Sequence, residues 1–509
     1  MPVSLRCVDP QAIIVGYDFS TGSVKALAFG VDGQAHTEVR FPTELFTDGG
    51  VSELSYLQLE GQALATTRAI AADLADLQME SHWVAGGISA THHTAGWLDD
   101  RGNPIRRMIC WNDQTLAKYH TVGLERLGGQ ERAKELSGGP WAVRYGLSHF
   151  VKDEETLSEL DWKRLAIFAP HALAAGGYLT GNFHQTSPST AASSGLLDLR
   201  TNRWRREMLA AVANEAHRET IWNCLPEVTE FDVPLGALSE SVALDAGLHT
   251  DLRPVFFPTL DDQAAGLVGG GATEPGQIAI ILGNSAVVNS SSNQLPASGT
   301  LDCMKLNWGP YLWMRCYSNG AQFLDRVLGP KPDWPMLEAT ARSVPPGCDG
   351  VAVLPFVLSE PSIGVDAPRF EWIGNPAEMG VKLRVSFEAI SYLMAMGVAE
   401  HEAAGQRVTR VTVSGGIAKS DLMCEIIASV LNKPVERLQS NEGPALGAAV
   451  VALAGMESYL RKEQGITEPY TVGDAVAQMV KFRGRVDPKP EWIATYRREL
   501  DLFTQRLRR

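Results

Sequence analysis

The sequence predicts an α/β protein with two related domains and a cleft between them, and three features support this prediction. Apolar stretches with strand and helix spacing alternate in both halves of the chain. A strand–turn–strand unit spans residues 13–29, and a similar unit spans residues 277–288. Each turn contains glycine and hydroxyl side chains, and turns of this kind present backbone N–H groups to phosphate oxygens. One such turn in each half predicts a nucleotide held between the two domains.

Length and charge limit the classes of partner. The chain has 509 residues, enough for about two to four domains. Apolar residues make up 45% and charged residues 20%, as in ordinary globular proteins. The net charge of -14 argues against a nucleic-acid backbone as the main partner. An anionic ligand would therefore need a local site of backbone amides, a metal ion or a few basic side chains.

Cysteine usage and hydropathy predict a compartment. The seven cysteines are odd in number and form no Cys-x-x-Cys pair, which favours reduced thiols over a disulfide framework or a zinc site. The N-terminus lacks a basic start followed by an apolar core, and no apolar run approaches the roughly 20 residues needed to span a membrane. We expect a cytoplasmic protein without a membrane or nucleic-acid partner.

Strand and helix signals can be placed along the chain. In the first half, a strand at 83–89 leads into two histidines, a turn at 99–104 leads to the segment 108–113, and residues 114–180 are mostly helical. Prolines near 250–260 mark a boundary between domains 1–258 and 259–509. The second half predicts strands at 350–356 and 408–414, a loop at 358–374, and helices at 384–404, 421–431, 446–452 and 491–509.

Asp18 stands at the end of an apolar strand, just before the first turn. A carboxylate beside a phosphate site can position a hydrated magnesium ion. The alternative is an aspartate that caps the turn. Lys25, on the returning strand, is expected to be a solvated residue, with a phosphate contact as the alternative.

Asp261 and Asp262 are adjacent, so their side chains should point in different directions. Asp262 precedes a good helix start and suits an N-cap. It also suits a general base that takes a proton from an attacking hydroxyl. Both readings stay open at this point.

Other polar residues suit a small polyhydroxylated ligand. His92 and His93 on a strand would face opposite sides, so they suit one metal ion poorly, and one of them would face a cleft and bind a hydroxyl. Residues 111–113, Trp-Asn-Asp, combine an apolar face with polar tips, as a sugar site does. Gly415 and Gly416 permit close approach to the backbone, although no Walker A or Gly-x-Gly-x-x-Gly motif is present. A core role is the alternative for the histidines and for Trp111.

The order of these pieces resembles the FGGY carbohydrate kinases over about residues 12–456. The matching segments are 16–26, 109–113, 262–266, 354–356 with Ser359 and Glu360, Arg384 with Glu388, 414–420 and 442–449. The resemblance implies two ribonuclease H-like domains of the actin-like ATPase fold, with a cleft between them.

The resemblance also implies roles for individual residues. Asp262 matches the catalytic base and is a second candidate metal contact, while Asp18 matches the carboxylate that holds Mg²⁺ through water. The implied nucleotide contacts are Asp18, Ser20, Thr21, Gly22, Ser23, Gly283, Asn284, Ser285, Gly415, Gly416, Lys419 and Ser420. The implied substrate contacts are His92, His93, Trp111, Asn112, Asp113 and Gln263.

The implied reaction is transfer of the γ-phosphoryl group of ATP, with Mg²⁺, to a sugar or polyol hydroxyl. A ketopentose of the xylulose or ribulose type is the leading acceptor, and glycerol or erythritol is an alternative. A non-catalytic nucleotide-switched protein of the same fold group and a phosphatase relative are further alternatives. The resemblance allows a homodimer. Departures from the family pattern include Ser20 in place of glycine, which would crowd the first turn, and Asn284 in place of threonine.

Overall fold

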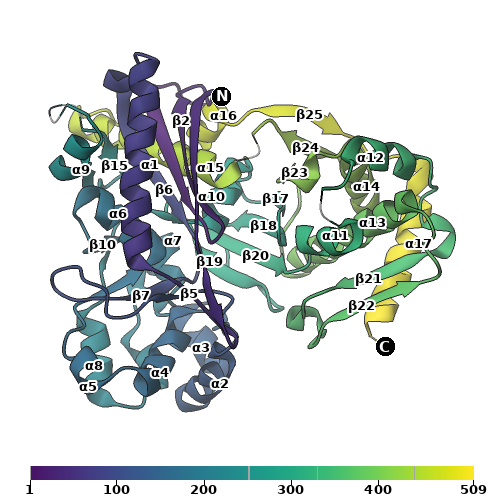
Figure 1. Cartoon of the computed structure of the whole chain (residues 1–509), viewed down its shortest axis with the longest axis horizontal. Helices are drawn as coiled ribbons and strands as arrows, with labels where there is room; N and C mark the ends of the chain where they lie inside the picture. The colour runs from purple at the N-terminus through teal and green to yellow at the C-terminus, as the bar shows by residue number, and fades with distance from the viewer. Residues whose placement is uncertain (1, 250, 252, 330, 441, 509) are drawn as a thin grey trace.

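The computed structural model describes residues 2–249, 251, 253–329, 331–440 and 442–508. Within them lie two seven-stranded sheets, one in each half of the chain, with two helices between them (Figure 1). Residues 250 and 252, close to the predicted boundary, and Arg509, the end of the predicted terminal helix, fall outside the described residues.

The first sheet is built around the first predicted strand–turn–strand unit. Its strands are β1 (Ile13–Phe19), β2 (Ser23–Gly30), β3 (Ala35–Pro42), β6 (Trp83–Ala90), β14 (Gly236–Ala237), β15 (Val255–Phe256) and β16 (Leu260–Asp261). The order is β14-β15-β6-β1-β2-β3, with β16 also paired to β6. β1 pairs antiparallel with β2 and parallel with β6. Helices α1 (Tyr56–Asp76) and α6 (His171–Thr180) pack on this sheet.

The second sheet repeats this arrangement. Its strands are β17 (Gln277–Leu282), β18 (Ala286–Ser292), β19 (Asp302–Lys305), β20 (Tyr311–Tyr317), β23 (Arg410–Ser414), β24 (Val435–Leu438) and β25 (Phe482–Val486). The order is β19-β20-β18-β17-β23-β24-β25. β17 pairs antiparallel with β18 and parallel with β23, as β1 does with β2 and β6. Both predicted strand–turn–strand units are therefore confirmed, and each lies at the centre of a sheet.

The remaining elements surround the two sheets. Below the first sheet in Figure 1 lies a group of helices, α2 (Leu116–Leu127), α3 (Gln130–Ser137), α4 (Gly146–Thr156), α5 (Glu159–Trp162) and α8 (Glu215–Asn223). A small sheet joins them, formed by β4 (Phe46–Asp48), β5 (Val51–Leu54), β7 (Ala95–Leu98), β8 (Met108–Ile109) and β9 (Ile167–Pro170). The short helix α7 (Pro188–Ala192) contacts β16 of the first sheet and β19 of the second. The second half adds α11 (Ala321–Leu328), α12 (Trp334–Arg342), α13 (Met379–Ala403), α14 (Asp421–Leu431), α16 (Val472–Met479), α17 (Pro490–Leu507), β21 (Ala352–Phe356) and β22 (Arg369–Ile373). Helix α14 has the predicted bounds. The predicted loop at 358–374 is wrong in part, because β22 lies within it and pairs with β21.

Helices α10 (Asp262–Gly269) and α15 (Gly443–Glu463) form the layer between the sheets, where α15 contacts β1 and β6 and α10 contacts β17 and β18. Two close approaches in this layer require glycine. A Cβ on Gly87 of β6 would lie 2.0 Å from the Ala448 carbonyl oxygen, and one on Gly447 of α15 would lie 1.9 Å from that of Ala265. Both oxygens belong to helical backbone, which cannot move aside cheaply.

Helix α15 also corrects the hydropathy prediction. With a mean hydropathy of 1.2, it is long and apolar enough by length and composition to cross a membrane. However, 78% of the apolar window is buried inside the protein, as expected for a core helix between two sheets. All seven cysteines are free thiols, as predicted.

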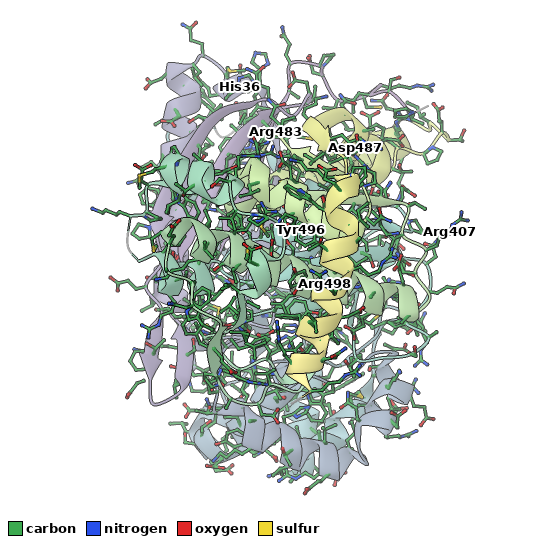
Figure 2. The ribbon with its side chains drawn as sticks, turned by 90° about the vertical axis from the view of Figure 1, so that its right-hand side faces the viewer. His36, Arg407, Arg483, Asp487, Tyr496 and Arg498 are labelled. Atoms are coloured by element: carbon green, nitrogen blue, oxygen red, sulfur yellow. The ribbon has the colours of Figure 1, made fainter. Side chains whose placement is uncertain are left out.

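The C-terminal helix α17 lies where a helix was predicted, and it packs on α13 and α14 in the second half of the molecule. Figure 2 shows α17 crossing this face, with Tyr496 near its centre. The Tyr496 hydroxyl donates to Glu388 Oε1 (3.1 Å) and accepts from Arg384 Nη2 (2.6 Å). Arg384 Nε and Glu388 Oε1 are 3.0 Å apart in a buried ion pair on α13. α17 therefore completes a buried polar cluster that α13 alone leaves unsatisfied.

We expect Gly87→Ala to destabilise the protein by at least about 1–3 kcal/mol, because the new methyl group would overlap the α15 backbone. The measurement is the free energy of unfolding in urea. Gly61→Ala is the matched control, since Gly61 lies on the exposed side of α1 with nothing within 4 Å of its Cβ position. Equal stability of the two variants would contradict the close packing of α15.

Candidate active site

A cavity of about 880 Å³ opens between the two halves of the molecule. Its walls come from the turns of both strand–turn–strand units, the segment after β6, the start of α10 and one face of β20. The lining residues are Ser20, Thr21, Gly22, Ser23, Lys25, Arg40, Pro42, Thr91, His92, His93, Trp111, Arg144, Asp262, Gln263, Asn284, Ser285, Met314, Cys316 and Ser318. The cavity thus brings together most of the predicted site residues from segments far apart in the sequence.

Ser20, which was expected to crowd the first turn, instead closes this turn with hydrogen bonds. Ser20 Oγ donates to the Ser23 carbonyl oxygen (2.8 Å) and accepts from the Ser23 N–H (3.3 Å). The Ser20 N–H also donates to the Ser23 carbonyl oxygen, at 3.0 Å. The hydroxyl therefore stabilises the turn, and Thr21 and Gly22 remain on the cavity wall.

The second turn is held by backbone hydrogen bonds. The Gly283 N–H donates to the Ser285 carbonyl oxygen (3.0 Å), and the Gly320 N–H donates to that of Asn284 (3.0 Å). Asn284 and Ser285 line the cavity, whereas Gly283 does not.

The glycine turn after β23 lies beside this second turn. Gly415 has a φ of +92°, and a Cβ there would lie 2.4 Å from the Leu282 carbonyl oxygen. None of Gly415, Gly416, Lys419 and Ser420 lines the cavity. Ser420 is the N-cap of α14, and its hydroxyl accepts from the Met423 N–H at 3.1 Å.

Lys25 lies on the cavity wall near the first turn, and Asp18 is buried next to it without lining the cavity. Lys25 Nζ is 2.6 Å from Glu442 Oε2 and 4.0 Å from Asp18 Oδ2. Only 16% of the Lys25 side chain is exposed, so the expectation of a solvated lysine is wrong. Glu442, which directly precedes α15, also pairs with Arg40 at 3.0 Å. Burial raises the pKa of Asp18 to about 6, and the Lys25 charge offsets only part of this effect.

The two adjacent aspartates have separate roles. Asp261, not Asp262, is the N-cap of α10: its Oδ1 accepts from the N–H groups of Gln263 and Ala264, both at 2.9 Å. Its Oδ2 accepts a hydrogen bond from the Ser189 hydroxyl. The prediction that Asp262 could be the cap is therefore wrong, because the preceding residue occupies that position. Asp262 lies on the cavity wall instead.

The surroundings of Asp262 disfavour its charged form. Oδ1 accepts from the His92 N–H (3.3 Å) and from Gln263 Nε2 (3.4 Å). Burial, followed by the nearby charges of Asp261 and Asp18, raises the pKa of Asp262 to about 8. A carboxyl group with a pKa near neutrality is suited to proton transfer.

His92 and His93 both line the cavity, which corrects the expectation that they face opposite sides. His93 has a φ of +52°, so the chain leaves the extended conformation and the two rings stack at 3.6 Å. His93 also stacks on Tyr145, at 4.5 Å. Burial is the main factor that lowers the pKa of both histidines, so both are neutral at pH 7.

The histidines offer unused hydrogen-bonding atoms. His93 Nδ1 lies 3.2 Å from the Ser193 carbonyl oxygen, which can only accept, so Nδ1 carries the proton and Nε2 is an acceptor. His93 Nε2 and both His92 ring nitrogens are buried and have no hydrogen-bond partner within the described part of the chain. A hydroxyl-bearing ligand would supply the missing partners.

Trp111 lies on the cavity wall, but Asn112 and Asp113 do not. Asn112 Oδ1 accepts from the Ser52 hydroxyl at 2.7 Å. Asp113 is 3% exposed and pairs with Lys152 Nζ at 3.1 Å. Through these contacts, Asn112 and Asp113 fix the loop that follows Trp111.

Arg144 is a cavity residue that the sequence analysis missed. It lies in the loop before α4 and forms an ion pair with Asp302 of β19, in the other half of the molecule. No local motif surrounds it, so only the three-dimensional structure could reveal it. By contrast, Met314, Cys316 and Ser318 follow the two-residue spacing of one strand face and could have been found from that pattern.

Three side chains that could ligate a metal ion lie close together: the potential ligand atoms of His92, Asp261 and Asp262 are within 4.8 Å of one another. Asp261 uses both carboxylate oxygens in bonds to α10 and Ser189. Asp262 and the nearby Asp18 remain as the oxygen ligands best suited to a hydrated magnesium ion.

Comparison with known proteins agrees with this geometry. The N-terminal domain of the FGGY family of carbohydrate kinases matches residues 13–269, and the C-terminal domain matches residues 331–456. A xylulose kinase from Bacillus subtilis is 23% identical over 96% of this chain and 95% of its own length. A glycerol kinase from Rhizorhabdus wittichii is 27% identical over 77% of this chain and 76% of its own length.

Solved structures show the same fold. A ligand-bound xylulose kinase from Lactobacillus acidophilus has a TM-score of 0.83 at 17% identity, covering 97% of both chains. A gluconate kinase from the same organism has a TM-score of 0.81 at 17% identity, with the same coverage. The expected fold of two ribonuclease H-like, actin-like domains is confirmed. This chain belongs to the FGGY family of carbohydrate kinases and is a phosphotransferase.

Proposed function

We propose that this kinase transfers the γ-phosphoryl group of ATP to a hydroxyl of a ketopentose of the xylulose or ribulose type, or of a polyol, with Asp262 as general base. The observation that carries the proposal is the division of roles at the start of α10. Asp261 satisfies the helix terminus, so Asp262 has no capping role and lies on the cavity wall. Glycerol and erythritol remain the alternative acceptors.

The two ends of the cavity suit different parts of the reactants. We assign the triphosphate to the two turns, through Ser20, Thr21, Gly22, Ser23, Gly283, Asn284 and Ser285. The adenosine would lie along Gly415, Gly416, Lys419 and Ser420, because this segment abuts the second turn. The acceptor would contact His92, His93, Trp111 and Gln263, whereas Asn112 and Asp113 would support that wall through Ser52 and Lys152.

Mg²⁺ fits the acidic end of the cavity. Asp18 is 4% exposed, and burial raises its pKa more than the Lys25 charge lowers it. A divalent cation nearby would stabilise the charged carboxylate further. Asp18 would hold the ion through water, with Asp262 as a second candidate contact. The ion would neutralise charge on the β- and γ-phosphates.

The chain's own residues would act mainly by positioning and proton transfer. Asp262 accepts the proton of the attacking hydroxyl as the new O–P bond forms and the bond from the γ-phosphorus to the bridging oxygen breaks. Gln263 and the His92 N–H orient the Asp262 carboxyl group through their hydrogen bonds. Closure of the domains would exclude water, which would otherwise compete as the acceptor.

The division into domains 1–258 and 259–509 is part of this proposal, with the cleft between them as the active site. The free thiols agree with an enzyme of the cytoplasm. A homodimer is the proposed assembly.

We expect Asp262→Asn to lower kcat for sugar phosphorylation by at least about 100-fold, because general-base help is typically worth 10²–10⁴-fold. ATP binding should change little, since Asp262 is assigned to the hydroxyl. The test is an ATP-consumption screen against ketoses and polyols, with ATP affinity measured by titration calorimetry. If the wild type binds ATP but none of the tested ketoses and polyols stimulates ATP consumption, the result would favour a nucleotide-switched protein instead.

We also expect Asp262→Asn to raise the melting temperature by an amount that grows between about pH 4 and pH 8. The folded pKa of about 8 exceeds the ordinary aspartate value of 3.8, so in this range the folded wild type binds a proton that the unfolded chain has lost. The wild-type carboxyl group therefore becomes more destabilising as pH rises, whereas asparagine does not titrate. Thermal melts from pH 5 to pH 9 measure the difference. A difference that stays constant or shrinks with pH would contradict the raised pKa.

A further inference from the structure

Arg144 lines the same cavity as Asp262. A row of rings joins the two residues: Asp262 accepts from the His92 N–H, His92 stacks on His93, and His93 stacks on Tyr145. The Arg144 guanidinium carbon lies 6.0 Å from the centroid of the Tyr145 ring. An acceptor whose reacting hydroxyl lies at Asp262 would therefore extend along the histidines toward Arg144.

The charge of Arg144 is already compensated. Its Nη2 donates to Asp302 Oδ2, and the Tyr145 hydroxyl donates to Asp302 Oδ1 at 3.3 Å. Asp302 is 8% exposed and does not line the cavity, so it acts on a ligand only through Arg144. The remaining Arg144 N–H groups can still donate to a hydroxyl or carbonyl oxygen.

The same balance holds for every cation of the cavity wall within the described residues. Lys25 pairs with Glu442 and lies 4.0 Å from Asp18, Arg40 pairs with Glu442 and with Glu38, and Arg144 pairs with Asp302. His92 and His93 are neutral because they are buried. Among the described residues the cavity wall therefore offers no unpaired cation, and an ionised carboxylate at the acceptor end would lose its hydration without gaining one.

We infer that the Arg144–Asp302 pair makes the acceptor site selective for uncharged sugars and polyols. The site would exclude aldonates that have the same number of carbon atoms. Arg144 is the specificity-determining residue that contacts the far end of the acceptor, and Asp302 is the positioning residue that cancels its charge. The inference rests on the proposed function. It narrows the acceptor class, because relatives with this fold include kinases named for a neutral sugar and for gluconate.

Equilibrium binding tests the inference separately from turnover. Titration calorimetry with D-xylulose and D-ribulose, and with D-xylonate and D-ribonate, gives the ratio of Kd values for acid over neutral ligand. We expect the wild type to bind the better pentonate on the order of 100-fold more weakly than the better ketopentose, because the ionised carboxylate loses its hydration where every cation is already paired. Equal or tighter binding of a pentonate, or no binding of either ketopentose, would overturn the inference.

Two variants should shift this ratio in opposite directions. Asp302→Asn frees the charge of Arg144 and should move the ratio toward pentonates by at least about tenfold. Arg144→Gln leaves the Asp302 carboxylate without a cation, and the ratio of Kd values should then favour ketopentoses more strongly than in the wild type. If one variant fails to fold, the direction of the other still decides. No shift, or shifts in the same direction, would contradict the assigned roles.

Asp198→Asn is the matched control. Asp198 forms an ion pair with Arg200 at 2.8 Å, is 5% exposed and does not line the cavity. Its removal changes the net charge equally and should leave the ratio unchanged. If the calorimetry shows the neutral preference but no ketopentose or polyol stimulates ATP consumption, the proposed function fails while the selectivity of the site stands.

Discussion

Helix α15 packs against its neighbours at distances that only glycine permits. Gly87 of β6 meets the backbone of α15, and Gly447 of α15 meets the backbone of α10. Through these contacts one helix fixes the spacing between the first sheet and the layer that leads to the second. The residue before α15, Glu442, forms the ion pair with Lys25 at the phosphate end of the cavity. The backbone packing of the core and the geometry of the active site are thus parts of one arrangement.

Three carboxylates gather where this layer meets the first sheet, and each is treated differently by its surroundings. Asp261 is fully hydrogen-bonded at the start of α10. Asp18 has only a 3.3 Å hydrogen bond from Ser89 and a lysine at 4.0 Å. Asp262 has two long hydrogen bonds and a pKa of about 8. Such a cluster is costly to fold, and its presence beside the cavity supports the proposal of a site that a cation and a hydroxyl substrate complete.

The sequence predicted the features that depend on local pattern. Both strand–turn–strand units, helix α14 and the different directions of Asp261 and Asp262 follow from residue spacing over a few positions. The stacked histidines did not follow, because a positive φ at His93 turns the chain where an extended strand was assumed. Arg144 and Asp302 are 158 residues apart, and no local rule pairs residues at that separation. Family resemblance therefore supplied the reacting groups that we propose, whereas Arg144 and Asp302, which we propose to select the acceptor, became visible only in the structure.

The cavity is bordered at both ends by ion pairs that join the first half of the chain to the second. Lys25 reaches Glu442 at the phosphate end, and Arg144 reaches Asp302 at the acceptor end. Both cations also line the cavity, so a ligand that engages either one must share it with a carboxylate of the other half. A ligand that shares these cations thereby alters the attraction between the two halves. Under the proposed function, binding at either end would therefore be coupled to the relative position of the two domains. That position would have to change for the cleft to close and exclude water before phosphoryl transfer.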